Sequence, residues 1–243
     1  MWAISKRELR LYFSQLTGYL IVGSYLLITS LILWFFNTPY NLLNSALGSF
    51  TPFFEFMPIL FLFLIPALSM RSFSEEFSQG TFELLMTKPL SPTQIFGGKL
   101  IGIILIVCIA LFPTVLHAIA LDHLLQLDST LDWGIVISSY LALLLLAGLF
   151  VTTSLCASLL FKSQVASFLV ALLACFIHLY LWSFLADLNS NLLLYKWLNN
   201  LSASSHYFGL SRGVIAFEDI LYFIGLCITF FLLGTQLIQQ KKS

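Results

Sequence analysis

The chain has 243 residues, of which 59% are hydrophobic and 9% are charged, and its mean hydropathy is +0.96. A soluble domain carries about 25% charged residues because its surface must face water, so this composition excludes a soluble globular protein and predicts an integral membrane protein. The 11 basic and 11 acidic residues balance, which gives no reason to expect a nucleic-acid partner.

Residues 1–17 are amphipathic and precede the first apolar segment. Such a helix would lie in the cytoplasmic interface, with its basic groups near anionic headgroups. An ordinary basic flank of the first span is the alternative. The expected apolar stripe consists of Trp2, Leu9, Tyr12, Phe13 and Leu16. The more polar side consists of Lys6, Arg7, Arg10 and Ser14.

Six apolar segments reach the length of about 20 residues that a helix needs to cross the hydrocarbon layer. The second contains Pro58 and Pro66, which membrane helices tolerate when neighbouring groups satisfy the freed carbonyls. The predicted fold class is an all-α integral membrane protein, with residues 1–243 forming one transmembrane domain. The six predicted spans are residues 18–36, 53–70, 95–121, 134–161, 164–186 and 220–238.

The basic residues predict the orientation, because loops on the cytoplasmic side are enriched in Lys and Arg. With the N-terminus in the cytoplasm, only Lys196 and Arg212 of the 11 basic residues fall outside. The segment 121–133 then lies outside, and it contains Asp122, Asp128 and Asp132 but no Lys or Arg. We therefore expect both termini to be cytoplasmic.

The longest polar stretch, residues 71–94, lies between the second and third spans on the expected cytoplasmic side. Gly80 is expected to end a first short helix, and Thr81 to cap a second one that ends at Pro89. On the cytoplasmic side the apolar residues of this second helix have no lipid core to enter. They must therefore lie on the membrane interface or meet a partner protein. These residues are Phe82, Leu84, Leu85 and Met86.

The third span begins at a well-defined point. Ser91, Pro92 and Gln94 combine a capping serine, a proline at the first helical position and a glutamine at the third. Gly98 and Gly102 then form a G-x-x-x-G, which permits close approach of another helix, in this subunit or across a dimer.

The sequence contains no phosphate-binding loop of the G-x-x-x-x-G-K-[ST] type, because Leu100 follows Gly98 and Lys99. No catalytic, cofactor-binding or metal-binding motif is present either. ATP hydrolysis, if the protein depends on it, must come from another chain.

His117 and His178 lie within the third and fifth spans. Ionisable residues inside a membrane are functional candidates, so either could line a substrate or proton path. A neutral histidine hydrogen-bonded to a neighbouring helix is the simpler interpretation. Two isolated histidines weigh against a secondary transporter or channel, which usually places charges or broken helices at the midplane. A non-transporting membrane scaffold remains a further alternative.

Residues 187–219 precede the last span and are long and partly apolar. The segment is too short and too interrupted to cross the bilayer and return. We expect an outer re-entrant or interfacial hairpin.

Two stretches resemble the ABC-2 type permease family. The run Glu75-Glu76…Gly80-Thr81-Phe-Glu83-Leu84-Leu85…Pro89 is similar to the loop between spans two and three of these permeases. The run Ser202…His206-Tyr-Phe…Arg212-Gly213-Val-Ile215…Asp219…Tyr222-Phe223 is similar to their segment before the last span. Within the family, the chain most resembles the GldF subfamily, the permease subunits of gliding-motility ABC transporters of Bacteroidetes. It departs from the pattern at Ala203, where many members carry proline.

The resemblance implies the fold of ABC-2, or type V, exporters and a permease subunit in the bacterial inner membrane that is not itself an enzyme. A short cytoplasmic coupling helix would dock into a separate ABC ATPase subunit, which binds the ATP. A second permease, either a copy or a related GldG-like chain, would complete the pathway. A solvated loop without such a role is the alternative. The coupling residues implied are Glu75, Glu76, Gly80, Thr81, Glu83, Leu84, Leu85 and Pro89.

Overall fold

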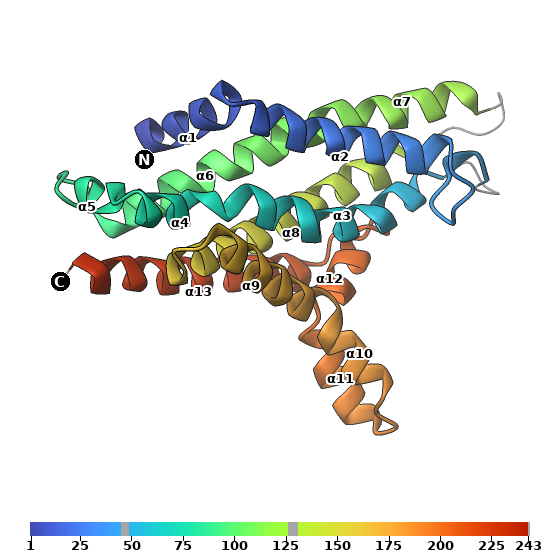
Figure 1. The fold of residues 1–243 in the computed structure, drawn as a ribbon. Coiled ribbons are helices and arrows are strands. Elements are labelled where there is room, and N and C mark those ends of the chain that lie inside the picture. Colours follow the sequence, from blue (N-terminus) through green and yellow to red (C-terminus); the bar gives the residue numbers. More distant parts are fainter. Residues whose placement is uncertain (45–48, 126–130, 243) are drawn as a thin grey trace.

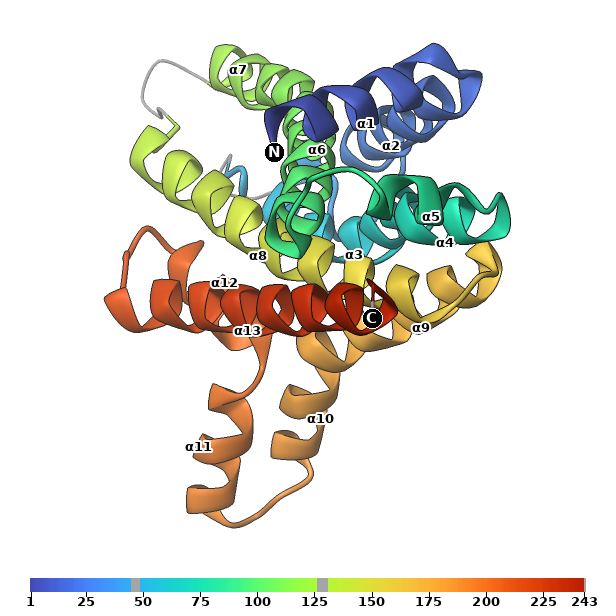
Figure 2. The same ribbon diagram turned by 90° about the vertical axis from the view of Figure 1, so that its left-hand side faces the viewer.

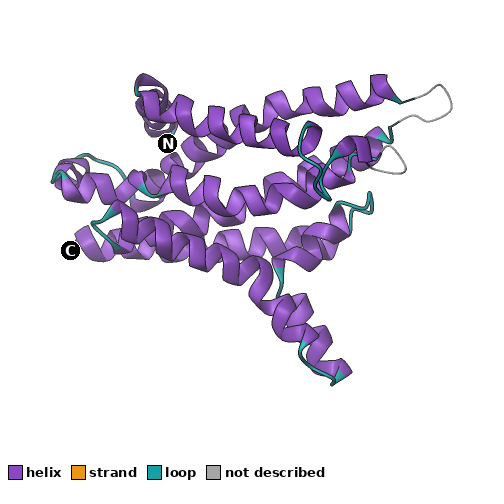
Figure 3. Cartoon of the chain, turned by 45° about the vertical axis from the view of Figure 1, so that its right-hand side comes forward, coloured by secondary structure: helices purple, strands orange, loops and turns teal. Residues whose placement is uncertain are grey.

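A computed structural model describes residues 1–44, 49–125 and 131–242 of the chain. Within these ranges every regular element is helical (Figure 3), and six helices are long and apolar enough to cross a membrane. The predicted all-α fold with six spans is confirmed. Asp128 lies outside the described residues. The six helices are Leu16–Trp34, Thr51–Ser78, Pro92–Leu124, Trp133–Leu160, Gln164–Asp187 and Phe217–Lys241.

Several spans are interrupted by short breaks, so the helices are numbered by their uninterrupted parts (Figure 1). In chain order they are α1 (Trp2–Ser14), α2 (Leu16–Trp34), α3 (Thr51–Ser69), α4 (Arg71–Ser78), α5 (Thr81–Met86), α6 (Pro92–Leu111), α7 (Val115–Leu124), α8 (Trp133–Leu160), α9 (Gln164–Phe176), α10 (Trp182–Asp187), α11 (Leu192–Asn200), α12 (Ala203–Leu210) and α13 (Phe217–Lys242). A π-helical turn, η3 (Ile177–Leu181), joins α9 to α10.

Helix α8 lies at the centre of the bundle and packs against α3, α6, α9 and α13. Its C-terminal half carries small hydroxyl residues, two of which form hydrogen bonds within the helix. The hydroxyls of Thr152 and Thr153 donate to the Leu149 carbonyl at 2.9 and 2.8 Å. This local bonding lets polar side chains lie in an apolar core without an unpaired donor.

A hydroxyl of α8 also bridges the break between α3 and α4 at Met70. The Ser158 hydroxyl accepts from the backbone N–H groups of Phe73 and Ser74, each at 3.1 Å, and donates to the Met70 carbonyl at 3.0 Å. The second span is therefore Thr51–Ser78, which continues beyond residue 70, where the sequence predicts its end.

Both termini and the α4–α5 turn lie at the same end of the bundle (Figures 1 and 2). This arrangement is the one expected if the termini and residues 71–94 face the same compartment. The assignment of that compartment to the cytoplasm rests on the distribution of basic residues.

The segment before the last span forms two distinct parts. Helices α10 and α11 make a hairpin that leaves the bundle at an angle (Figure 1), and no residue of α11 is buried. Helix α12 returns to the bundle, where the hydroxyl of the fully buried Tyr207 donates to the Phe54 carbonyl at 2.7 Å. Ala203, where the sequence departs from the expected family pattern, begins α12 and is itself fully buried.

Candidate functional site

The α4–α5 turn is shaped by a left-handed residue. Gly80 has a φ of 67° and is the N-cap of α5, and a Cβ built there would meet no atom within 4 Å. Its backbone conformation, rather than crowding, therefore favours glycine. The prediction that Thr81 caps α5 is wrong, because Thr81 is the first helical residue and its hydroxyl turns back to the Glu76 carbonyl at 3.4 Å.

The other end of the segment 71–94 agrees with the prediction. Ser91 is the N-cap of α6 and accepts from the Gln94 N–H at 3.2 Å, while the Gln94 side chain accepts from the Ser91 N–H. This reciprocal capping box holds the start of α6 in place.

The apolar residues of α5 divide between the interior and the surface. Phe82 and Leu85 are only 6% and 4% exposed, and the Phe82 ring lies 4.5 Å from that of Phe77. Leu84 is 66% exposed. The expectation that all these residues need a membrane or a partner is therefore wrong for Phe82 and Leu85, because both are buried within the protein, Phe82 against Phe73 and Phe77 of α4.

The exposed surface of the turn is formed by a subset of the predicted coupling residues. Leu85 supports it from inside, and Glu75 is partly buried against Arg71, with Oε2 2.9 Å from Arg71 Nε. Glu76 is directed inward, away from the surface that a partner would contact. The exposed members are Gly80, Thr81, Glu83, Leu84 and Pro89.

Glu76 belongs to a buried ion-pair cluster that joins three helices. The Lys99 ammonium on α6 lies 3.0 Å from Glu8 Oε1 on α1 and 3.0 Å from Glu76 Oε1 on α4. It also donates to the Ser72 carbonyl, and Arg7 contacts Glu76 from the outer side. A buried charge is tolerated only when it is well paired, so this cluster ties α1, α4 and α6 together.

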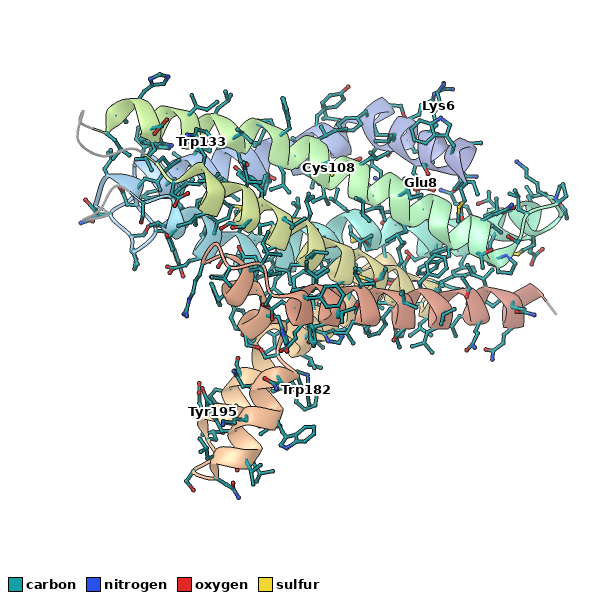
Figure 4. All side chains as sticks on the ribbon, turned by 180° about the vertical axis from the view of Figure 1, so that it is seen from behind. Lys6, Glu8, Cys108, Trp133, Trp182 and Tyr195 are labelled. Atoms are coloured by element: carbon teal, nitrogen blue, oxygen red, sulfur yellow. The ribbon has the colours of Figure 1, made fainter. Side chains whose placement is uncertain are left out.

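Sequence reasoning missed this cluster. The charge distribution places Lys99 among the basic residues of the expected cytoplasmic side, and the helical pattern of residues 1–17 gives Glu8 no role. One signal was available: Glu8 is spaced four residues from both Ile4 and Tyr12, which share its buried face. Figure 4 shows Glu8 pointing from α1 toward α6, whereas Lys6 points away from the bundle.

The G-x-x-x-G of α6 lies against α1 within the same subunit. A Cβ at Gly98 would lie 2.7 Å from Ile4 Cβ, and one at Gly102 would lie 2.9 Å from Glu8 Cβ. The Ser5 hydroxyl donates to the Gly98 carbonyl at 2.8 Å. The two glycines thus permit the close approach that brings Glu8 to Lys99.

Helix α1 differs in one respect from the predicted amphipathic pattern. Trp2 and Leu16 are exposed as an apolar stripe requires, but Tyr12 is buried on the side that faces α4. Arg7 pairs with Glu76 instead of pointing only to the polar side. The burial of Tyr12 also raises the pKa of its phenol, so this hydroxyl keeps its proton.

Arg71 connects two helix junctions next to this cluster. It donates from Nη1 to Thr17 Oγ1 at 3.0 Å and from Nη2 to Gln15 Oε1 at 2.9 Å, and it pairs with Glu75 in its own helix. The α1–α2 junction is therefore tied directly to the α3–α4 junction.

The two histidines of the spans have different surroundings. Trp34 of α2 donates from Nε1 to His117 Nδ1 at 3.0 Å, and Ser30 lies 3.4 Å from the other ring nitrogen. His178 lies in the π-helical turn and packs edge-on against Phe230, with ring centroids 5.3 Å apart. His117 is thus hydrogen-bonded to a neighbouring helix. Nowhere in the described ranges do three His, Cys, Asp or Glu side chains come together as a metal site.

Comparison with known proteins identifies a family that the chain matches. A family model described as "ABC-2 family transporter protein" matches residues 11–242, which is nearly the whole chain. Among curated proteins, none matches the chain.

Proposed function

Because the chain belongs to the ABC-2 family of transporter membrane proteins, we propose that it receives the motion of a separate ATPase at its α4–α5 turn. Members of this family are multi-pass membrane permeases and are not themselves the ATPase, so an ABC ATPase acts in trans. The proposal concerns how this chain engages that partner.

The form of the α4–α5 turn is the main support for this proposal. Leu84 presents an apolar side chain and Glu83 a charge on an exposed helix of one and a half turns, while Phe82 and Leu85 anchor the same helix from inside. An exposed apolar anchor surrounded by polar groups is typical of a binding surface. Such a surface can transmit a push only if its backing is rigid.

The backing continues into the spans along two routes. Helix α4 leads into α3 through the Ser158 bridge, and Glu76 of α4 contacts Lys99 of α6. A displacement of α5 would therefore move α3 and α6 together, and α1 with them through Glu8.

We further propose the wider setting that the sequence resemblance suggests. The chain would lie in the bacterial inner membrane with both termini cytoplasmic, and it would work beside a second permease, either a copy or a GldG-like chain. The resemblance of residues 75–89 and 202–223 to GldF-type permeases supports a role in gliding motility. Native mass spectrometry of the intact complex tests the pairing, and a complex with a single permease would contradict it.

The docking proposal is tested by co-purification of the ATPase. Glu83→Ala combined with Leu84→Ala is expected to abolish co-purification and ATPase stimulation, because both exposed anchors are lost. Leu160→Ala is a matched control, since Leu160 is also an exposed leucine but is the last residue of α8 and lies outside the turn. Binding and stimulation that survive in the double variant would refute docking at α5.

A further inference from the structure

The C-terminal end of α13 lies at the same end of the bundle as the α4–α5 turn (Figures 1 and 2). There the Lys241 ammonium lies 4.0 Å from the centre of the Phe77 ring on α4. The same ammonium donates to the Leu159 carbonyl of α8 at 2.8 Å. One side chain of the last span thus contacts two other helices, α4 and α8.

The Leu159 carbonyl is a suitable partner for a cation. The last four carbonyls of a helix have no partner within that helix, and they carry a partial negative charge. Leu159 is the penultimate residue of α8, and the last turn of α8 contains no basic residue of its own. Lys241 supplies the missing positive charge from α13, and the bond to the carbonyl orients its ammonium beside the Phe77 ring.

The Phe77 ring in turn supports the exposed helix α5. Phe77 is half-buried, and its ring centroid lies 4.5 Å from that of Phe82, which anchors α5 from inside. Lys241 of α13 and Phe82 of α5 therefore contact the same ring. The position of α5 depends on a side chain that the last span helps to hold.

A second contact between these elements runs through the interior. Phe73 of α4 lies 6.4 Å from Phe82 and 6.3 Å from Phe96 of α6, measured between ring centroids. Phe96 then meets Phe231 of α13 edge-on at 5.3 Å. Within α13, Phe231 and Lys241 are ten residues apart, which corresponds to about 15 Å along the helix. Two contacts this far apart resist tilting of the turn against α13, which a single contact does not.

We propose that Lys241 is a positioning residue for coupling to the ATPase, because it holds the α4–α5 turn against the end of the last span. The inference rests on the docking proposed at α5, and it adds α13 to the helices that a displacement of α5 moves. Without the Lys241 ammonium the interior contact at Phe231 remains, but the turn can tilt about it. Part of the displacement is then lost before it reaches α13.

The first test is hydrogen–deuterium exchange of the full-length permease alone, over residues 77–86. Lys241→Met keeps the apolar stem and removes the cation, so exchange should become about fivefold faster, the effect of one exposed cation–π contact. Lys241→Arg should restore wild-type exchange, because arginine also stacks on rings and donates N–H groups. Lys162→Met is the matched control, since Lys162 is exposed two residues beyond the end of α8 and makes no cation–π contact within the described part of the chain.

The second test is titration of the ATPase onto the permease, with the binding affinity and the maximal ATPase stimulation recorded separately. Lys241→Met should lower the maximal stimulation about threefold. Its affinity for the ATPase should stay unchanged, because the exposed Glu83 and Leu84 are intact. Lys241→Arg should restore stimulation. The unfolding temperature of Lys241→Met should stay within about 2 °C of wild type, as for other exposed positions, so a loss of folding cannot account for the result.

Unchanged exchange over residues 77–86 in Lys241→Met would overturn the proposal. So would wild-type stimulation in this variant while it still binds the ATPase, or an equal effect of Lys162→Met. A wild-type permease that does not bind the ATPase through α5 would instead contradict the docking proposal. The exchange measurement needs no ATPase, so it would still decide whether Lys241 holds the turn.

Discussion

Lys99 of α6 and Glu8 of α1 form an ion pair at 3.0 Å in which both side chains are almost completely buried. The two residues are 91 positions apart, and they meet because Gly98 and Gly102 let α1 approach α6 closely. The pair makes the N-terminal helix an integral part of the bundle rather than a separate surface anchor.

Removal of the lysine should destabilise the protein strongly. Lys99→Ala leaves Glu8 and Glu76 buried without their shared cation, and breaking a buried pair in this way costs about 3–5 kcal/mol. Denaturant unfolding in detergent measures the loss. Lys6→Ala, on the exposed side of α1, should change the free energy of unfolding by less than about 0.5 kcal/mol. Equal stability of the two variants would contradict the prediction.

Enlargement of Gly98 should separate α1 from α6. The Cβ of Gly98→Val would meet Ile4 Cβ at 2.7 Å, and overpacking of this kind costs about 1–3 kcal/mol. Hydrogen–deuterium exchange over residues 2–14 should therefore accelerate. Gly23→Val is the control, because a Cβ at Gly23 meets nothing within 4 Å. Protection of α1 that is unchanged in Gly98→Val would rule out this contact as the anchor.

A side chain at Gly80 should strain the turn without crowding it. Gly80→Ala places an L-residue at a φ of 67°, which costs about 1–2 kcal/mol. Gly80→Asn should be milder, because asparagine tolerates the left-handed region better. Both variants are compared by ATPase stimulation and by unfolding, with Gly225→Ala as the control in open space. An alanine variant more stable than the asparagine variant would show that the turn is not held left-handed.

At the opposite end of the bundle, His206 should be required to hold α12 on α13. Its Nδ1 lies 2.6 Å from Asp219 Oδ1 and its Nε2 lies 2.9 Å from the Asn200 carbonyl, while its ring stacks on Tyr222. The ring nitrogens therefore link Asp219 of α13 to the end of α11. His206→Ala should lower the free energy of unfolding by about 1.5–3 kcal/mol.

The matched control for His206 is His123, which is exposed in the last turn of α7. His123→Ala should leave both unfolding and the exchange of α12 amides unchanged. Similar effects of the two substitutions would show that the contact with Asp219 adds no stability.

Local sequence patterns predicted much of the fold because they depend on interactions between residues that are close together in the chain. The six spans follow from hydropathy over about 20 residues, and the helix start at Ser91 follows from capping chemistry within four residues. The break at Gly80 was also predicted, since glycine is the residue best suited to a left-handed position.

The parts that were missed depend on contacts between distant segments. Hydropathy identifies Phe82 and Leu85 as apolar residues that need to be buried, but only the fold shows that the protein itself buries them. Likewise, Glu76 reads as a surface charge until Lys99 is brought beside it from α6. Among the predicted coupling residues, the exposed members are thus separated from the buried ones by tertiary packing alone.

The Ser158 hydroxyl braces the break at Met70 against bending. It bonds to backbone groups of Met70, Phe73 and Ser74, so α4 cannot swing on α3 without losing hydrogen bonds to the central helix. Helix α4 has eight residues and is about 12 Å long, so a swing of roughly 10° would otherwise absorb about 2 Å of movement at its far end. The serine thus leaves that movement to α3 instead of letting it be lost as bending at the junction.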